Sequence, residues 1–148
     1  MLDVSALVAR HLGRKVYLDT NLFIYVLNGT PGFVAPSVEL LDACSRGDLV
    51  GLTGDLTLAE LLVQPLRLND AAAVAAVREL LVESGAVTLV GHDRACFERA
   101  ALLRARHGLK MPDALHLATA QLAGAACCVS NDQQFPTLDD IECVRLAG

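Results

Sequence analysis

Aromatic residues are scarce in this 148-residue chain, which contains no tryptophan, two tyrosines and four phenylalanines. Its core must therefore be packed from Leu, Val, Ile and Ala, and the scarcity of rings argues against a surface that binds nucleic acid by extensive base stacking. Hydrophobic residues still make up 53% of the chain and charged residues 20%, which argues against an intrinsically disordered protein. The length suits one compact domain with its own core.

No apolar run is long enough to cross a bilayer. The longest weakly polar stretch, Leu115–Val129, falls short of the roughly 20 apolar residues that a membrane-spanning helix needs. Four residues interrupt its apolar pattern, namely His116, Thr119, Gln121 and Gly124. The N-terminus carries Asp3 and has no basic region followed by a small-residue cleavage site, so we expect no secretory signal and no membrane partner. The expected location is the cytoplasm.

Several common functional motifs are also missing. The five cysteines are odd in number and show no Cys-x-x-Cys spacing, which predicts neither a disulfide framework nor a zinc site. Cys127 and Cys128 stand in an apolar run that predicts a buried strand, where thiols behave as small hydrophobic groups. The glycine-rich loops that bind nucleotide phosphates are absent, which argues against a nucleotide-binding protein. The formal net charge of −5 argues against a protein that coats nucleic acid.

Apolar runs alternate with helical patterns along the whole chain, which predicts an α/β fold with a mainly parallel sheet. No linker divides the chain, so we expect a single domain over residues 1–148, with residues 1–14 as a helical extension. The predicted strands are Lys15–Leu18, Leu49–Thr53, Ala86–Val90, Cys127–Ser130 and Glu142–Leu146. The predicted helices are Asp3–His11, Asn21–Leu27, Ser37–Arg46, Leu58–Val63, Asp70–Ser84, Arg94–His107 and Pro112–Ala123, with a loop over Asn28–Pro36.

Four acidic residues stand where predicted strands end or predicted helices begin. Asp19 ends the first strand and can cap the next helix, while Asp132 follows the fourth strand in a sequence typical of a turn. Glu60 fits a capping box with Thr57 as the N-cap residue. Asp113 suits the positive end of a helix dipole. Each acid, taken alone, therefore has a structural explanation.

The joint placement of these acids favours a functional explanation. Open α/β sheets bind ligands at the carboxyl ends of their parallel strands. If the first and fourth strands are neighbours, Asp19 and Asp132 leave the sheet side by side, and helix starts can face the same crevice. Clustered carboxylates raise one another's pKa values unless a cation joins them, and oxygen ligands select Mg²⁺ or Mn²⁺. We therefore predict a metal site formed by Asp19, Glu60, Asp113 and Asp132.

Basic residues gather just ahead of Asp113, in a segment whose one acid is Glu98. Two interpretations are equally open, a solvated helix face and a surface that steers phosphate groups. The second interpretation makes substrate-binding candidates of Arg94, Arg99, Arg104, Arg106 and Lys110.

Four sequence blocks together resemble a PIN domain, and in particular the VapC-like toxins of type II toxin–antitoxin pairs. The blocks are Leu18-Asp-Thr-Asn21, Thr57-Leu-Ala-Glu60, Pro112-Asp-Ala-Leu-His-Leu-Ala-Thr-Ala120 and Ser130-Asn-Asp-Gln-Gln-Phe135. The resemblance runs from about Lys15 to Leu146 and implies a three-layer sandwich with a five-stranded sheet in the order 3-2-1-4-5. That order makes the first and fourth strands neighbours.

The resemblance also implies that the four acids bind Mg²⁺ or Mn²⁺ and support hydrolysis of RNA phosphodiester bonds. The residues matching the small polar positions of the family, Thr20, Asn21 and Ser130, would shape the site around them. A cognate antitoxin and a homodimer are further expectations. Two alternatives remain open, a housekeeping PIN nuclease in RNA maturation and an inactive PIN-like binding module. The extra N-terminal helix could dock onto a second subunit or onto the sheet edge.

The expected reaction is metal-assisted attack of water on phosphorus, which gives a 5′-phosphate and a 3′-hydroxyl. Asp19 and Asp113 are the expected direct ligands, while Glu60 and Asp132 would bind directly or through water. This chemistry needs no histidine as acid or base. We therefore expect His116 to occupy a packed or partly exposed helix position rather than the site.

Overall fold

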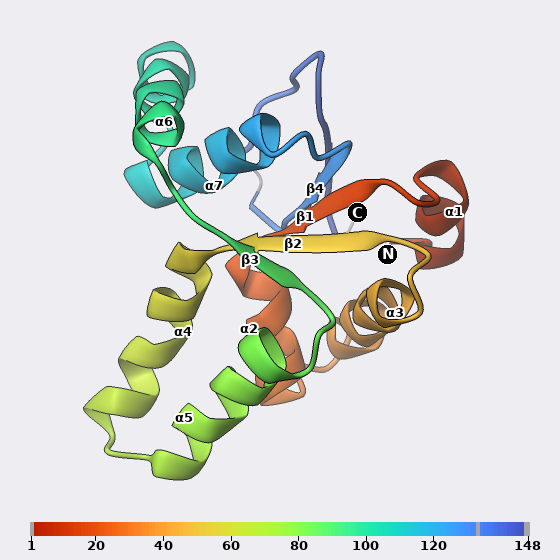
Figure 1. The fold of residues 1–148 in the computed structure, drawn as a ribbon, viewed down its shortest axis with the longest axis vertical. Coiled ribbons are helices and arrows are strands. Elements are labelled where there is room, and N and C mark those ends of the chain that lie inside the picture. Colours follow the sequence, from red (N-terminus) through yellow and green to blue (C-terminus); the bar gives the residue numbers. More distant parts are fainter. Residues whose placement is uncertain (1, 133, 147–148) are drawn as a thin grey trace.

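The computed structural model describes residues 2–132 and 134–146. Five parallel strands form one sheet in the order β3-β2-β1-β4-β5 (Figure 1), which confirms the predicted order. The strands are β1 (Lys15–Leu18), β2 (Val50–Gly54), β3 (Thr88–Val90), β4 (Cys127–Val129) and β5 (Glu142–Val144). Three terminal residues of the predicted domain, Met1, Ala147 and Gly148, and Gln133 of the fourth sequence block lie outside the described residues.

Helices cover both faces of the sheet and make the three layers that were predicted (Figure 1). One core lies between the sheet and the first set of helices and includes Phe23 and Leu40, while a second core on the opposite face includes Tyr17 and Leu117. The first set comprises α1 (Val4–Arg10), α2 (Thr20–Asn28), α3 (Val34–Ser45), α4 (Asp55–Arg67), α5 (Ala71–Arg78) and the π-helical turn η1 (Glu79–Glu83). The second set comprises α6 (Arg94–His107) and α7 (Met111–Leu122).

Two helices extend past prolines that were predicted to bound them. α3 begins at Val34, so Pro36 lies in its first turn, where a backbone N–H has no partner within the helix. α4 begins at Asp55, directly after β2, and ends at Arg67 with Pro65 in its last turn. Pro65 has no backbone N–H and so removes one helical hydrogen bond, and the buried apolar face of α4, which includes Leu61, outweighs this loss.

The N-terminal extension docks onto the edge of the sheet in its own chain. Val4 and Leu7 of α1 are buried in the first core. The backbone N–H of Leu2 donates to the carbonyl of Leu146 at 2.9 Å, and the Arg10 guanidinium pairs with Glu142, which begins β5, at 2.6 Å. The extension is thus part of the packed fold and ties the two ends of the chain together.

The predicted buried strand at Cys127 and Cys128 is confirmed. All five cysteines, each within the described part of the chain, are free thiols. Cys127 and Cys128 are fully buried, and burial raises the pKa of the Cys127 thiol to about 12. Along residues 2–132 and 134–146, no helix is both long and apolar enough to cross a membrane.

Candidate active site

The candidate site lies at the edge of the sheet where β1 and β4 end. These two strands are neighbours, with Leu18 opposite Val129. The backbone N–H of Asp19 continues the ladder by donating to the Val129 carbonyl at 3.0 Å. Asp19 therefore leaves β1 beside Ser130, which follows β4. The strand adjacency that the metal-site hypothesis requires is confirmed.

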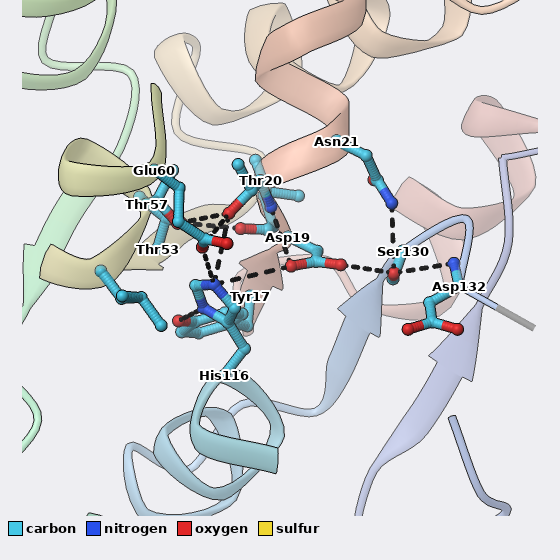
Figure 2. Close-up of polar contacts among 12 residues, drawn as sticks. Tyr17, Asp19, Thr20, Asn21, Thr53, Thr57, Glu60, His116, Ser130 and Asp132 are labelled. Carbon is cyan, nitrogen blue, oxygen red and sulfur yellow. Dashed lines mark hydrogen bonds and ion pairs between the residues drawn. The ribbon is translucent and has the colours of Figure 1, made fainter. Parts of the chain in front are cut away.

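Both carboxylate oxygens of Asp19 are held by hydrogen bonds (Figure 2). Oδ1 accepts from the backbone N–H of Thr20 at 2.8 Å and so caps α2, while Oδ2 accepts from the Ser130 hydroxyl at 2.6 Å. Asp19 is only 6% exposed. The capping role and a role in the site are compatible, because capping fixes the carboxylate at the end of β1.

Ser130 joins Asp19 to the loop that carries Asp132, as Figure 2 shows. Its hydroxyl oxygen accepts from the backbone N–H of Asp132 at 3.0 Å, and the Asn21 amide lies at 3.5 Å, the long limit of a hydrogen bond. The Asp132 side chain accepts from the backbone N–H of Gln134 at 2.8 Å, which is the predicted turn. Ser130 and Thr20 therefore contact the acids directly, whereas Asn21 contacts Ser130.

Glu60 does not form the capping box that would have given it a purely structural explanation. The N-cap residue of α4 is Gly54, and Thr57 lies inside the helix with its hydroxyl 2.8 Å from that of Thr53. Glu60 is turned towards α2 instead, where its Oε1 accepts from the Thr20 hydroxyl at 2.8 Å. Burial raises the pKa of Glu60, but the hydrogen bonds from His116 and Thr20 outweigh this effect. The net pKa is lowered, so Glu60 is ionised at neutral pH.

Asp113 stands in the first turn of α7 and is half-buried. Its pKa is raised from 3.8 to about 6, first by burial, then by the charge of Asp132 and a hydrogen bond with it, and then by the charge of Asp19. The three acids are thus close enough to interact electrostatically. The repulsion between these adjacent carboxyls favours the protonated form of Asp113.

His116 lies in the site, which the sequence interpretation missed. The packed position that we predicted is confirmed, because its side chain is 1% exposed. Its Nε2 nevertheless lies 2.7 Å from Oε1 of Glu60 and 3.8 Å from Oδ1 of Asp19 (Figure 2). On the opposite side, the hydroxyl of Tyr17 lies 2.7 Å from Nδ1. The spacing between Asp113 and His116 indicates this position, because residues three apart lie on the same face of a helix.

The predicted basic segment covers α6 and the turn that follows it. Arg104 donates from its guanidinium to the carbonyl of Leu109 at 2.9 Å and so closes the end of α6. Arg99 and Arg106 are seven residues apart and lie on one face of the helix. Within the described part of the chain, none of the five predicted cations forms an ion pair with a carboxylate. Their role in phosphate binding remains a prediction.

The donor set fits a divalent cation in its chemistry, although the four side chains are not gathered around one point. Among residues 2–132 and 134–146, no three His, Cys, Asp or Glu side chains are arranged to hold a metal ion. The acids instead form two groups, in which Glu60 contacts Thr20 and His116 while Asp113 interacts with Asp132 and Asp19. All four offer hard oxygen ligands of the kind that Mg²⁺ and Mn²⁺ prefer.

Solved structures of similar fold include chains of toxin–antitoxin proteins. A chain of a toxin–antitoxin complex from Klebsiella pneumoniae is 21% identical, with a TM-score of 0.66 and coverage of 85% of this chain and 94% of that one. A chain of VapBC2 from Rickettsia felis, bound to a promoter DNA fragment, is 15% identical, with a TM-score of 0.70 and coverage of 88% and 98%. Mycobacterium tuberculosis VapC20, a toxin that cleaves the Sarcin-Ricin loop, is 17% identical, with a TM-score of 0.61 and coverage of 76% and 86%.

No curated protein matches the sequence. The family model for the PIN domain does match, over residues 16–141. This range includes all four acids, the strand ends that carry Asp19 and Ser130, and the helix that carries Asp113 and His116. Nucleases of this family generally depend on divalent metal ions. The chain belongs to the PIN domain family.

Proposed function

We propose that this protein is a divalent-metal-dependent endoribonuclease and the toxin of a toxin–antitoxin pair. Its metal ligands and catalytic residues would be Asp19, Glu60, Asp113 and Asp132. The family assignment supports a nuclease, and the solved structures of similar fold include toxins and their complexes with antitoxins. Identity to those structures is too low to transfer a substrate, so RNA is part of the proposal.

The main support for the proposal is the electrostatic interaction among three acids, Asp19, Asp113 and Asp132, which come from three segments of the chain. Asp113 titrates at about 6 because it is partly buried beside Asp132 and within reach of the charge of Asp19. A protein gains nothing in stability from bringing like charges together at a partly buried edge. A divalent cation bound between these acids would replace their mutual repulsion by attraction to a common positive charge.

In this proposal the four acids would bind the cation and Ser130 would orient one of them. Asp19 and Asp113 would hold the cation directly, and Glu60 and Asp132 directly or through water. A bound Mg²⁺ or Mn²⁺ would supply Lewis acidity at a phosphate oxygen and at the attacking water. Ser130 keeps the Asp19 carboxylate oriented, which spares the reaction the cost of reorienting it. The expected products carry a 5′-phosphate and a 3′-hydroxyl.

Two partners belong to the proposal besides RNA, a cognate antitoxin and a second copy of the chain. An apolar groove of about 410 Å³ runs between α2, α4 and α5 and reaches Glu60, so a bound antitoxin could cover the site. Ile24, Leu27, Leu61 and Leu68 are among its lining residues. Copurification with the product of a neighbouring gene, and the mass of the complex in solution, test both partners.

Incubation of the purified protein with a mixed RNA pool in Mg²⁺, in Mn²⁺ and in EDTA tests the activity. Asp19→Asn is the informative variant, and Asp42→Asn, an exposed acid of α3, is its matched control. We expect cleavage that requires metal, survives in Asp42→Asn and is lost in Asp19→Asn with an unchanged circular dichroism spectrum. Cleavage in EDTA, or equal cleavage by both variants, would refute the metal-site mechanism. Absence of cleavage with every RNA would favour an inactive binding module.

A further inference from the structure

A buried chain of hydrogen bonds stands behind Glu60, and the proposed reaction does not use it. The Tyr17 hydroxyl lies 2.7 Å from Nδ1 of His116, and Nε2 of the same ring lies 2.7 Å from Oε1 of Glu60. Tyr17 is fully buried and His116 is 1% exposed. Polar groups buried this deeply must form hydrogen bonds to be tolerated. Here the hydrogen bonds run from Tyr17 through His116 to the carboxylate of Glu60.

The donors fix the direction of each hydrogen bond. Burial raises the pKa of Tyr17 far above its usual value, so the phenol keeps its proton. That proton has Nδ1 of His116 as its acceptor, which leaves Nδ1 without a hydrogen. Nε2 must then carry the ring hydrogen and donate to Glu60, because a neutral imidazole has one N–H.

Glu60 is consequently anchored through one of its two oxygens. Oε1 accepts from His116 at 2.7 Å and from the Thr20 hydroxyl at 2.8 Å. Among the described residues, no hydrogen bond is recorded for the other oxygen, Oε2. The ring N–H also lies 3.8 Å from Oδ1 of Asp19, so it stands between the two carboxylates. A donor in that position reduces the repulsion between the two carboxylates.

We propose that Tyr17 and His116 are positioning residues. Tyr17 fixes the Nε2–H tautomer of His116, and His116 anchors one oxygen of Glu60. The other oxygen of Glu60 is left for a cation or water. The catalytic part of this inference rests on the proposed function, whereas the tautomer does not. Thr20 completes the anchor from α2. Orienting groups of this kind typically change metal affinity or activity about 10- to 100-fold when they are removed.

Long-range ¹H–¹⁵N spectra of the histidine rings test the tautomer in the metal-free protein. His116→Gln and His107→Gln, the latter an exposed residue of α6, assign the signals by removing one ring each. We expect a neutral His116 ring with hydrogen on Nε2 alone, and loss of that preference in Tyr17→Phe but not in Tyr25→Phe. Hydrogen on Nδ1, or on both nitrogens, in the wild-type protein would overturn the inference whatever the nuclease assays show.

Mn²⁺ titration and steady-state cleavage test the anchor. His116→Gln keeps a donor near the Nε2 position and His116→Leu does not. We expect His116→Leu to lower Mn²⁺ affinity and kcat at least about tenfold, with KM for RNA within about twofold, and His116→Gln to restore most of the loss. Equal losses in both variants, or a change in KM alone, would contradict the anchor. If the wild-type protein binds Mn²⁺ but cuts no RNA, the proposed function fails, and the Mn²⁺ affinities of the variants still decide the anchor.

Discussion

Asp113→Asn should make the metal-free protein more stable at neutral pH although it removes a group of the site. The folded-state pKa of Asp113, about 6, lies above the ordinary value of 3.8, so the folded protein holds this proton more tightly than the unfolded chain does. Below pH 3.8 the carboxyl is protonated in both states and costs nothing. As the pH rises towards 6 the unfolded chain releases its proton first, and the folded state is increasingly penalised.

The size of the effect follows from the same two values. Each tenfold change in proton affinity is worth about 1.4 kcal/mol, so a rise from 3.8 to about 6 corresponds to about 3 kcal/mol above pH 6. Asp113 is only half-buried, and solvent screening removes about half of this figure. The favourable position of Asp113 in the first turn of α7 offsets roughly another 0.5 kcal/mol. We expect Asp113→Asn to stabilise the protein by about 1 kcal/mol at pH 7.5.

Urea unfolding in EDTA at pH 4 and at pH 7.5 measures this difference. The variant should be close to the wild type at pH 4 and more stable at pH 7.5, with a melting temperature about 2–4 °C higher for each kcal/mol in a chain of this size. Addition of Mn²⁺ should stabilise the wild type and reverse the order. A variant that is less stable by the same amount at both pH values would refute this reasoning, because Asp113 would then be a structural helix residue.

Three further changes test the fold and the basic surface. Gly54→Ala should destabilise the protein by about 2–3 kcal/mol in urea, because its new Cβ would lie 2.4 Å from Cε1 of His92; an unchanged midpoint would contradict the packing. Leu117→Ala, at a fully buried position, should cost about 2–5 kcal/mol in the same assay, and a loss below about 1 kcal/mol would contradict its place in the core. Arg99→Gln should weaken RNA binding and lower the slope of log affinity against log salt concentration by about 0.7. The control Arg46→Gln, on the far side of the sheet, should change neither. Equal effects of the two variants would indicate that Arg99 belongs to a solvated helix face.

The sequence predicted the sheet and the strand ends well, for a physical reason. Parallel strands buried on both faces are continuous apolar runs, and residues such as Asp19 and Ser130 interrupt those runs where the strands end. Helix boundaries were less predictable, because Pro36 and Pro65 are local signals whereas helix length is set by packing. The alternative explanation of Glu60, a capping box with Thr57, fails for the same reason, since both side chains form tertiary hydrogen bonds instead.

His116 could not be placed from its sequence context alone. A histidine in an apolar helix is usually a packed side chain, and the structure shows that it is packed and also in contact with the site. What decides its role is Tyr17 on the other side of the ring, 99 residues away in the chain. Such a contact depends on how α7 lies across β1, which no short sequence pattern records.

The scaffold around the acids orients them without neutralising them. The groups that hold Asp19 and Glu60 are a hydroxyl of Ser130, a hydroxyl of Thr20, a backbone N–H and the imidazole of His116, and none of them is a lysine or an arginine. Within residues 2–132 and 134–146, no lysine or arginine forms an ion pair with any of the four acids. An arginine in place of these donors would orient a carboxylate equally well but would cancel its charge. The negative charge that remains at the end of the sheet therefore favours a mobile positive group, which in the proposed function would be a divalent cation during hydrolysis or an arginine of an antitoxin in the inhibited complex.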